Sequence, residues 1–379
     1  MDAARVRVLL GFGAFGAFWG VWGAVLPQVQ RHSHVDDSQL GTALLFVGVG
    51  ALLSIRVVGG LADRWPRATL PYAIAALSLA GALPAIVVGV AGLAMTLLIL
   101  RVCSGATDAA INATAARVEA SGSAALSLGH GMFSAAVVFA SLCVAAVGTT
   151  RTGRPSVLFA VAVLLLVVAL VTASLPAGLV QMPPASLTHH RLSWPLVVLG
   201  LFAALAYLLE NAWQSWGAIQ LHSTLGATLQ VAALGPAVFA GFAAVGRFAG
   251  HHLTGRIPAV TLLGAGASLA AAASLLAALA HSVPLALVGI GAAGLGTSVC
   301  APTLIAIAAR RFPTTSGAAT STVITIAYLG FVLGPAAVGL LSGATTLPTA
   351  LTAVALVGAA LAIMSPTVRN LDTNTSSAR

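Results

Sequence analysis

Charged side chains are scarce in this chain of 379 residues. Asp, Glu, Lys and Arg together make up 7% of it, whereas hydrophobic residues make up 59%. Lysine is absent, so all 17 basic residues are arginines. A soluble domain carries charged groups at about a quarter of its positions. Together with a mean hydropathy of +1.02, this composition excludes a soluble protein and indicates a chain that lies in lipid.

Cysteines and catalytic motifs are also scarce. Cys103, Cys143 and Cys300 all fall within apolar runs, where small packing residues are the expected role and no disulfide is expected. No phosphate-binding loop, metal-ligand cluster or nucleophile elbow is found, so we expect no cofactor, no metal and no enzyme activity. The net charge of +9 lies in short loops between apolar runs, which does not indicate nucleic-acid binding.

Long apolar runs make up most of the sequence, and each has the length of a helix that crosses a bilayer. We expect an all-α membrane protein with twelve transmembrane helices, at 8–28, 39–61, 69–89, 91–114, 124–148, 156–175, 194–219, 228–250, 258–280, 284–308, 314–341 and 346–365. The predicted domains are an N-terminal six-helix bundle, a central cytoplasmic loop, a C-terminal six-helix bundle and a disordered cytoplasmic tail, at 1–175, 176–193, 194–365 and 366–379.

Arginines in the loops predict the orientation. An even number of spans places both termini on one side. If that side is the cytoplasm, most loop arginines lie inside, and the outer loops hold Arg31, Arg151 and Arg154. The positive-inside rule therefore favours cytoplasmic termini. The absence of lysine beside abundant alanine, glycine and arginine is typical of a GC-rich bacterial genome, so the expected location is a bacterial inner membrane.

The two halves repeat short patterns at matching places. Trp22-Gly23-Ala24-Val25 in the first span returns as Trp216-Gly217-Ala218-Ile219 in the seventh. Arg56-x-x-Gly59 at the end of the second span returns as Arg247-x-x-Gly250 at the end of the eighth. Two six-helix bundles in parallel repeat are the architecture of rocking secondary transporters, whose substrate site lies near the middle of the bilayer.

The loop after the second span carries Gly59-Gly60-Leu61-Ala62-Asp63-Arg64-Trp65-Pro66-Arg67. This run resembles the signature of the major facilitator superfamily, with Pro66 where the family usually has glycine. An ordinary charged turn is the alternative. The second-half copy has Thr254 and Gly255 in place of Asp-Arg, which implies an asymmetric latch. The resemblance implies a secondary transporter whose gating residues are Gly59, Asp63, Arg64 and Arg67.

The fourth span carries charge inside the membrane, where an ionisable group costs about 2.5–3.5 kcal/mol and marks a pathway. Arg101, Gly105, Asp108 and Asn112 share one helical face. Seven residues of helix separate Arg101 from Asp108, a rise of about 10.5 Å, so each is expected to have another partner. The stripe should face a wet cavity; a structural ion pair that holds the bundle together is the alternative.

Two further runs narrow the resemblance. Asp108-x-x-x-Asn112 and His130-Gly131-Met132-Phe133-Ser134 resemble the fucose-permease-like branch of the superfamily. The resemblance implies that Asp108 binds a proton or a sugar hydroxyl and that Asn112 is a hydrogen-bonding ligand. Arg101, in an Arg-x-x-x-Gly pattern, resembles a motif linked to proton transfer. A histidine titrates near neutral pH, so His130 is a further proton site, and a satisfied core histidine is the alternative.

The seventh span reads Glu210-Asn211-Ala212-Trp213-Gln214-Ser215-Trp216 and resembles the same branch, with Ser215 where that branch has a second acid. Glu210 is then the proton carrier of this half, or else a hydrogen-bonded structural acid. Indoles suit the apolar faces of sugars, and packing or an interfacial belt is their alternative role. The predicted proton-coupling residues are Arg101, Asp108, His130 and Glu210. The predicted substrate-binding residues are Trp19, Trp22, Asn112, Asn211, Trp213, Gln214 and Trp216.

These patterns lead to one functional expectation and two alternatives. We expect a monomer in the lipid bilayer that moves a small organic solute, preferably a sugar or similar polar metabolite, by proton-coupled alternating access. A proton-driven exporter of drugs or metabolites is the first alternative, although the fifth span lacks the Gly-Pro of drug antiporters. A non-transporting sensor or a membrane-embedded enzyme is the second, and the intact Asp63-Arg64 pair speaks against the sensor.

Overall fold

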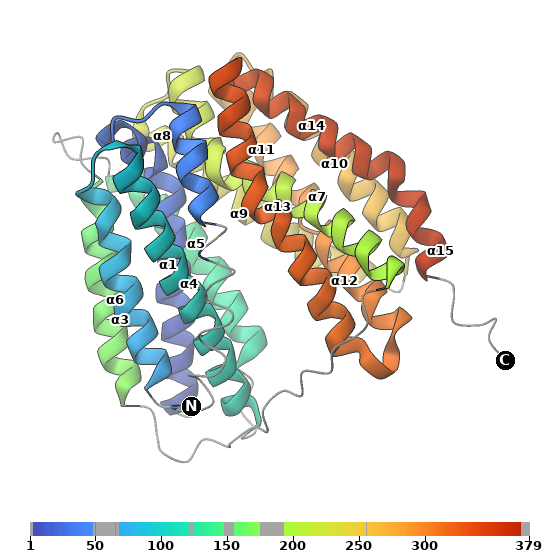
Figure 1. Cartoon of the computed structure of the whole chain (residues 1–379), viewed down its shortest axis with the longest axis horizontal. Coiled ribbons are helices and arrows are strands. Elements are labelled where there is room, and N and C mark those ends of the chain that lie inside the picture. The colour runs from blue at the N-terminus through green and yellow to red at the C-terminus, as the bar shows by residue number, and fades with distance from the viewer. Residues whose placement is uncertain are drawn as a thin grey trace. The chain divides into compact units, whose positions relative to one another are not determined.

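The computed structural model describes residues 3–47, 50, 65, 68–120, 125–147, 155–174, 193–254 and 256–372. Regular structure in these ranges is helical throughout (Figure 1). Within them, nine helical segments are long and apolar enough to cross a membrane, and Thr69–Ala85 and Val157–Ala173 are shorter apolar helices. The prediction of an all-α membrane protein is therefore confirmed. The count of twelve helices and the parallel repeat stay predictions.

The chain forms two compact units. The first comprises Met1–Ala185 and Thr228–Ala237, and the second comprises Ser186–Ala227 and Val238–Arg379. The predicted central loop, apart from Ser193, lies outside the described residues.

Helices of the first unit overlap the predicted spans, but the predicted eighth span, 228–250, is interrupted at Ala233. They are α1 (Ala3–His32), α3 (Thr69–Ala82), α4 (Gly89–Ala120), α5 (Leu126–Val147), α6 (Val157–Ala173) and the short α8 (Leu229–Ala232). Residues 37–47 are also helical. Helices α1 and α5 touch at backbone distance, because a Cβ on Gly16 or Gly20 would overlap the carbonyl oxygen of Phe133 or Val137.

A tight turn joins α3 to α4, where the sequence predicts almost no loop. Leu83–Ala85 forms a 3₁₀ turn, and Gly89 then begins α4. Gly89 has φ +78°, a left-handed conformation that glycine adopts without a steric penalty. Its N–H donates to the Ser33 carbonyl at 2.8 Å, which ties this turn to the end of α1.

Helices of the second unit surround an apolar core that includes Phe202, Leu263, Leu304 and Val323. They are α7 (Trp194–Ile219), α9 (Leu234–Leu253, of which the part from Val238 belongs to this unit), α10 (Ala259–Ala278), α11 (Val283–Thr297), α12 (Cys300–Arg311), α13 (Ser316–Ala344), α14 (Leu347–Met364) and α15 (Arg369–Asp372). A π-helical turn, Gln220–Thr224, extends α7.

The predicted tenth span, 284–308, is broken into α11 and α12 at Ser298 and Val299. Pro302 explains the position of the break. Proline lacks the N–H that would bond to the carbonyl four residues earlier, which belongs to Ser298.

The tail differs from its prediction as a disordered segment. Ser365–Val368 forms a 3₁₀ turn and α15 follows it. The Arg311 guanidinium donates to the Leu371 carbonyl at 2.6 Å, which anchors α15 to the end of α12. This hydrogen bond contributes to the helical order of residues 366–372. Residues 373–379 lie outside the described residues.

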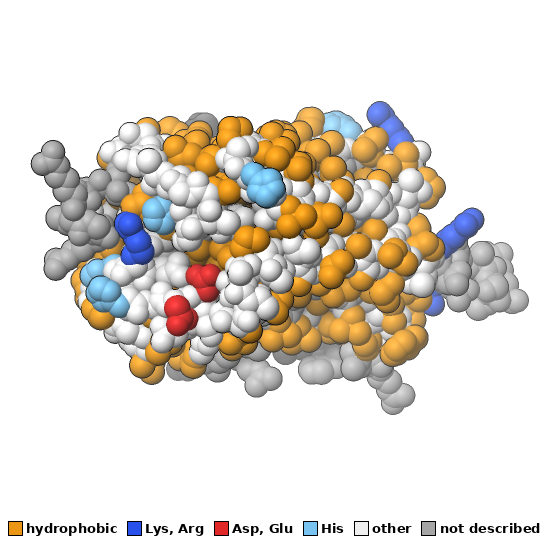
Figure 2. Space-filling view, turned by 90° about the horizontal axis from the view of Figure 1, so that it is seen from above, with side chains coloured by type: hydrophobic (Ala, Val, Ile, Leu, Met, Phe, Trp, Pro, Cys, Tyr) orange, Lys and Arg blue, Asp and Glu red, His pale blue; other side chains and the backbone are white. Residues whose placement is uncertain are grey.

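Apolar side chains cover much of the surface, as Figure 2 shows for one face. On α6 the side chains of Val163, Val167 and Leu170 are all exposed, with Leu170 at 69%. A surface of this kind is unfavourable in water and favourable in lipid. The exposed apolar faces therefore agree with helices that lie in a bilayer.

Candidate functional site

Helix α7 places a set of polar side chains on one face. Tyr207, Glu210 and Gln214 follow each other at intervals of three and four residues, which brings them together on a helix. The Gln214 side-chain amide donates to Glu210 Oε1 at 3.0 Å. Glu210 is thus held by a neighbour from its own helix, one turn further along.

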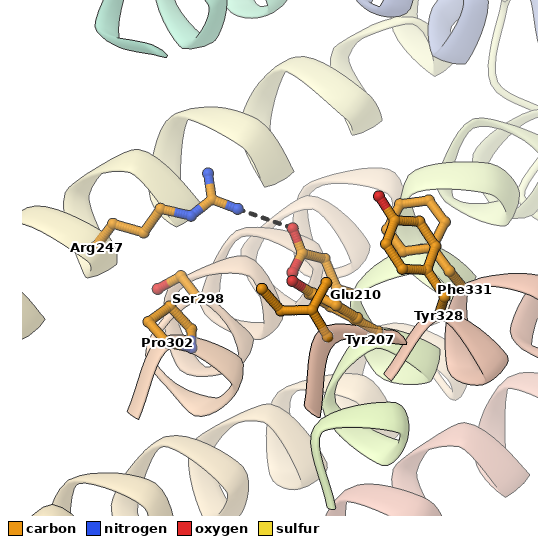
Figure 3. A pocket seen from close by; sticks show the side chains of 8 residues that line it. Tyr207, Glu210, Arg247, Ser298, Pro302, Tyr328 and Phe331 are labelled. Atoms are coloured by element: carbon orange, nitrogen blue, oxygen red, sulfur yellow. Dashed lines mark hydrogen bonds and ion pairs between the residues drawn. The ribbon is translucent and has the colours of Figure 1, made fainter. Parts of the chain in front are cut away.

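Arg247 on α9 provides the opposite charge. Its Nη2 donates to Glu210 Oε1 at 2.8 Å, and the two side chains point toward each other in Figure 3. The side chain of Glu210 is 11% exposed and that of Arg247 47%. A buried carboxylate that lost this partner would keep a charge with little solvent, which is strongly unfavourable.

The ion pair forms part of the wall of a cavity of about 270 Å³ within the second unit. Aromatic, hydroxyl and aliphatic groups complete the wall, from Tyr207, Ser298, Pro302, Ile324, Tyr328 and Phe331. The Phe331 ring packs edge-on against Tyr207, with ring centroids 5.6 Å apart. The cavity thus combines a guanidinium, a carboxylate, phenols and an aromatic face, a set that suits a polar solute with apolar C–H surfaces.

The other predicted residues of the seventh span are used in packing. Asn211 donates to the Phe331 carbonyl at 3.3 Å. The Trp213 indole N–H donates to Ser274 Oγ at 2.7 Å, and the Trp216 indole N–H donates to the Pro335 carbonyl at 2.9 Å. Both indoles are fully buried and neither lines the cavity.

Predicted residues of the first unit also lie together. Asn112 donates to Asp108 Oδ1 at 2.9 Å, one helical turn away on α4. Both Arg101 and His130 interact electrostatically with the Asp108 carboxyl. The Arg101 guanidinium lies 5.5 Å from the ring centroid of Trp19, a cation–π contact. The structure therefore gathers five of the predicted residues around the middle of α4.

Of the predicted residues of the first unit, His130 lies at the surface and Trp22 lies in the interior. The side chain of His130 is exposed and its ring packs against Phe12, with centroids 5.2 Å apart. Trp22 is buried within the first unit.

Sequence reasoning missed most of the cavity wall. It placed Arg247 only in a repeated motif and did not pair it with Glu210. A signal for Tyr207 existed, since it lies three residues before Glu210, and the chain has only three tyrosines. Tyr328 and Phe331 carried no such signal, because their place depends on how α13 packs against α7.

The predicted gating residues, Gly59, Asp63, Arg64 and Arg67, lie outside the described residues. Within the described ranges, no group of three or more His, Cys, Asp or Glu side chains is placed to hold a metal ion.

No protein-family model matches the chain. The chain is 30% identical over 362 residues to an uncharacterised transporter, y4wD, of Sinorhizobium fredii, covering 91% of this chain and 92% of that one. It is 28% identical over 335 residues to an uncharacterised MFS-type transporter of Yersinia pestis, covering 88% and 87%. The fold is similar to the crystal structure of a point mutant of the nucleoside transporter NupG, with a TM-score of 0.80 and 16% identity over 96% and 99%.

Proposed function

Since the chain belongs to the major facilitator superfamily of transporters, we propose that it moves a small organic solute across a bacterial inner membrane by proton-coupled alternating access. The preferred solute is a sugar or a similar polar metabolite. The proposal includes twelve helices in two six-helix bundles, cytoplasmic termini, a monomeric state and Glu210 as the carrier of the coupled proton.

One observation carries the assignment of the proton site: the buried Glu210 carboxylate is paired with Arg247 in the wall of a cavity. Protonation removes the charge that holds Arg247, so the two protonation states favour different arrangements of α7 and α9. A ligand shifts a conformational equilibrium only by its difference in affinity for the two states. A proton that binds Glu210 only after its ion pair with Arg247 has separated has different affinities for the two conformations.

The cavity wall also supports a polar solute with apolar faces. Tyr207, Tyr328 and Ser298 offer hydroxyl groups, and Phe331 offers a flat ring. Sugars hydrogen-bond through their hydroxyls and stack their C–H faces on aromatic rings. The transporter of similar fold named above carries nucleosides, which are polar metabolites as well. The substrate-binding set that we propose for this unit therefore includes these residues and Gln214. Trp213 and Trp216 pack outside the cavity wall and do not belong to the set.

Asp108 is the second proton site of the proposal. Its carboxyl accepts from Asn112, which holds its orientation, and the Arg101 guanidinium lies on the same face of α4. The two units then each contribute one acid, and the experiment below separates their roles.

Proteoliposomes with an imposed pH gradient test the proposal. The solute is first identified by the thermal shift that monosaccharides, polyols, organic acids and lipophilic drugs produce in the purified protein. We expect Glu210→Gln to abolish accumulation driven by the pH gradient and to leave solute exchange intact, because an amide does not take up and release a proton at physiological pH. Glu119→Gln is the matched control and should accumulate solute normally. Glu119 is the other glutamate of the chain and is exposed at the end of α4.

Three outcomes would count against parts of the proposal. Full accumulation by Glu210→Gln would exclude Glu210 as the proton carrier, and loss of accumulation in Asp108→Asn alone would assign the role to Asp108. Binding only of lipophilic drugs would replace the sugar assignment by an exporter.

A further inference from the structure

A second cavity of about 660 Å³ lies in the second unit, next to the first. The two cavities share Arg247, Ser298 and Pro302 on their walls. The larger one lies where α9 and α12 end and α10 begins, the ends that the sequence predicts to face the cytoplasm. Its described wall also holds His251 and Arg310 and contains no acidic side chain.

Acidic residues are few in the whole second half of the chain. From residue 194 onward the sequence contains two, Glu210 and Asp372, and the first of these already binds Arg247. The arginines in the same stretch are at 247, 256, 310, 311, 369 and 379. This half of the chain therefore carries a net positive charge, which favours an anionic ligand beside its arginines.

The repeat in the sequence points to the same place. In the first half, Arg56 is followed seven residues later by Asp63, the acid of the loop motif. In the second half, Arg247 is followed at the same spacing by Thr254. Thr254 lines the cavity, and its hydroxyl donates to the Gly250 carbonyl at 2.8 Å. The position that carries a carboxylate in the first half thus has a neutral side chain here.

Helix ends at the cavity do not cancel the arginine charge. Each end is equivalent to about half an elementary charge, positive where a helix begins and negative where it ends. Two ends, of α9 and α12, and one beginning, of α10, sum to about half a negative charge, less than one arginine contributes. The first turn of α10 has no acidic residue, and its N-cap, Pro258, provides no side-chain hydrogen bond.

We propose that this cavity binds an oxyanion, the carboxylate or phosphate group of a cytoplasmic solute or of an anionic lipid headgroup. A guanidinium matches two oxygens of such a group with parallel N–H donors. Arg310 is a direct ligand. Arg247 borders both cavities, so an anion in the larger one competes with Glu210 for the same guanidinium. The site does not depend on proton coupling.

Thermal unfolding of the purified protein tests the site. In neutral detergent, phosphate and citrate are compared with chloride at equal ionic strength. In a separate arm, phosphatidylcholine nanodiscs with and without phosphatidylglycerol are compared. A ligand of the folded state raises Tm with concentration. We expect this rise in the wild type and in Arg256→Gln. Arg256 is exposed, lies between α9 and α10, and is not part of the cavity wall. In Arg310→Gln the affinity should fall about tenfold, since a charge-assisted hydrogen bond is lost.

The two arms also identify the source of the anion. A rise with phosphate or citrate assigns the site to soluble anions, and a rise only with phosphatidylglycerol assigns it to a lipid headgroup. Arg310→Lys should recover part of the response, because it keeps the charge. Glu210→Gln removes the carboxylate that competes for Arg247, so it should keep or strengthen the response, and failure of the proton proposal is thereby distinguished from failure of this one. An equal response in Arg310→Gln and the wild type, or no response to any anion, would overturn the proposal. So would an Arg310→Gln protein that is less stable at every anion concentration by the same amount.

Discussion

The two buried indoles of α7 each have a specific hydrogen-bond partner. The Trp213 and Trp216 indoles are fully buried and donate to one side-chain oxygen and one backbone oxygen, respectively. A buried donor without an acceptor costs about 1–3 kcal/mol, which is large beside the total stability of a folded protein. These pairs explain how large aromatic residues can surround a polar cavity without exposing unsatisfied groups.

Ser274→Ala tests how much the hydrogen bond from Trp213 contributes to stability. The substitution removes the hydroxyl that accepts from Trp213 and leaves a buried N–H without a partner, so we expect a loss of about 1–3 kcal/mol of stability. Thermal unfolding in detergent measures it as a lower Tm. Ser268→Ala lies on the same helix with an exposed side chain and should change stability by less than about 0.5 kcal/mol. Equal effects of the two substitutions would show that the buried hydrogen bond contributes little.

The residues of the site were predictable to different degrees, for physical reasons. A charge in an apolar run is visible in the sequence, so Glu210 and Asp108 were found, and the partners Asn112 and Gln214 lie one helical turn away on the same face. Arg247 belongs to another helix, and no spacing rule within α7 points to it. Trp213 was predicted to meet solute because an indole can equally stack or pack, and only the contact with Ser274 shows which of these it does.

At the scale of elements, helix pairs are held at backbone distance by glycine. A Cβ added to Gly330 on α13 would overlap the carbonyl oxygen of Ala204 on α7. In membranes, small residues at a helix contact increase van der Waals packing, which replaces the hydrophobic effect as the main attraction between helices. This contact fixes α13 against α7 and thereby places Tyr328 and Phe331 beside Glu210.

Gly330→Ala should therefore destabilise the second unit. The new methyl group meets a backbone carbonyl, which cannot move without shifting a helix, so we expect a cost of about 1–3 kcal/mol from overpacking. Gly317→Ala is the control on the same helix, where a Cβ would enter open space, and it should be neutral or stabilising by up to about 1 kcal/mol. Thermal unfolding compares the two, and a Gly330→Ala protein as stable as the control would contradict the close contact.

Most described helices overlap the apolar run that predicted them, although α1 extends beyond both predicted ends and the predicted eighth span is interrupted at Ala233. The tenth span is different, because Pro302 lies inside an apolar run that reads as continuous by hydropathy alone. Its missing N–H breaks the helix without any change in composition. The end of the chain is different for the opposite reason: its polar sequence suggests disorder, but the bond from Arg311 to Leu371 holds α15 in place.

For the whole molecule, composition determines the class of protein but not its orientation in the membrane. The apolar content requires lipid around the helices, whichever side the chain starts from. Orientation depends on where the arginines lie, and the loops that hold several of them, including Arg64 and Arg67, are outside the described residues. The cytoplasmic termini and the count of twelve spans therefore need a measurement at positions whose place on a helix is known.

Helix α10 offers such a measurement. Its 20 residues extend about 30 Å, enough to cross the hydrocarbon core, and Pro258 and Ser282 lie exposed beyond its two ends. With cytoplasmic termini and eight preceding spans, Pro258 faces the cytoplasm and Ser282 the outside. A membrane-impermeant maleimide added to intact cells should label Ser282→Cys above the level of the unsubstituted protein, and Pro258→Cys only after the membrane is permeabilised. Labelling in the reverse order would mean that the spans before α10 are odd in number or that the N-terminus lies outside.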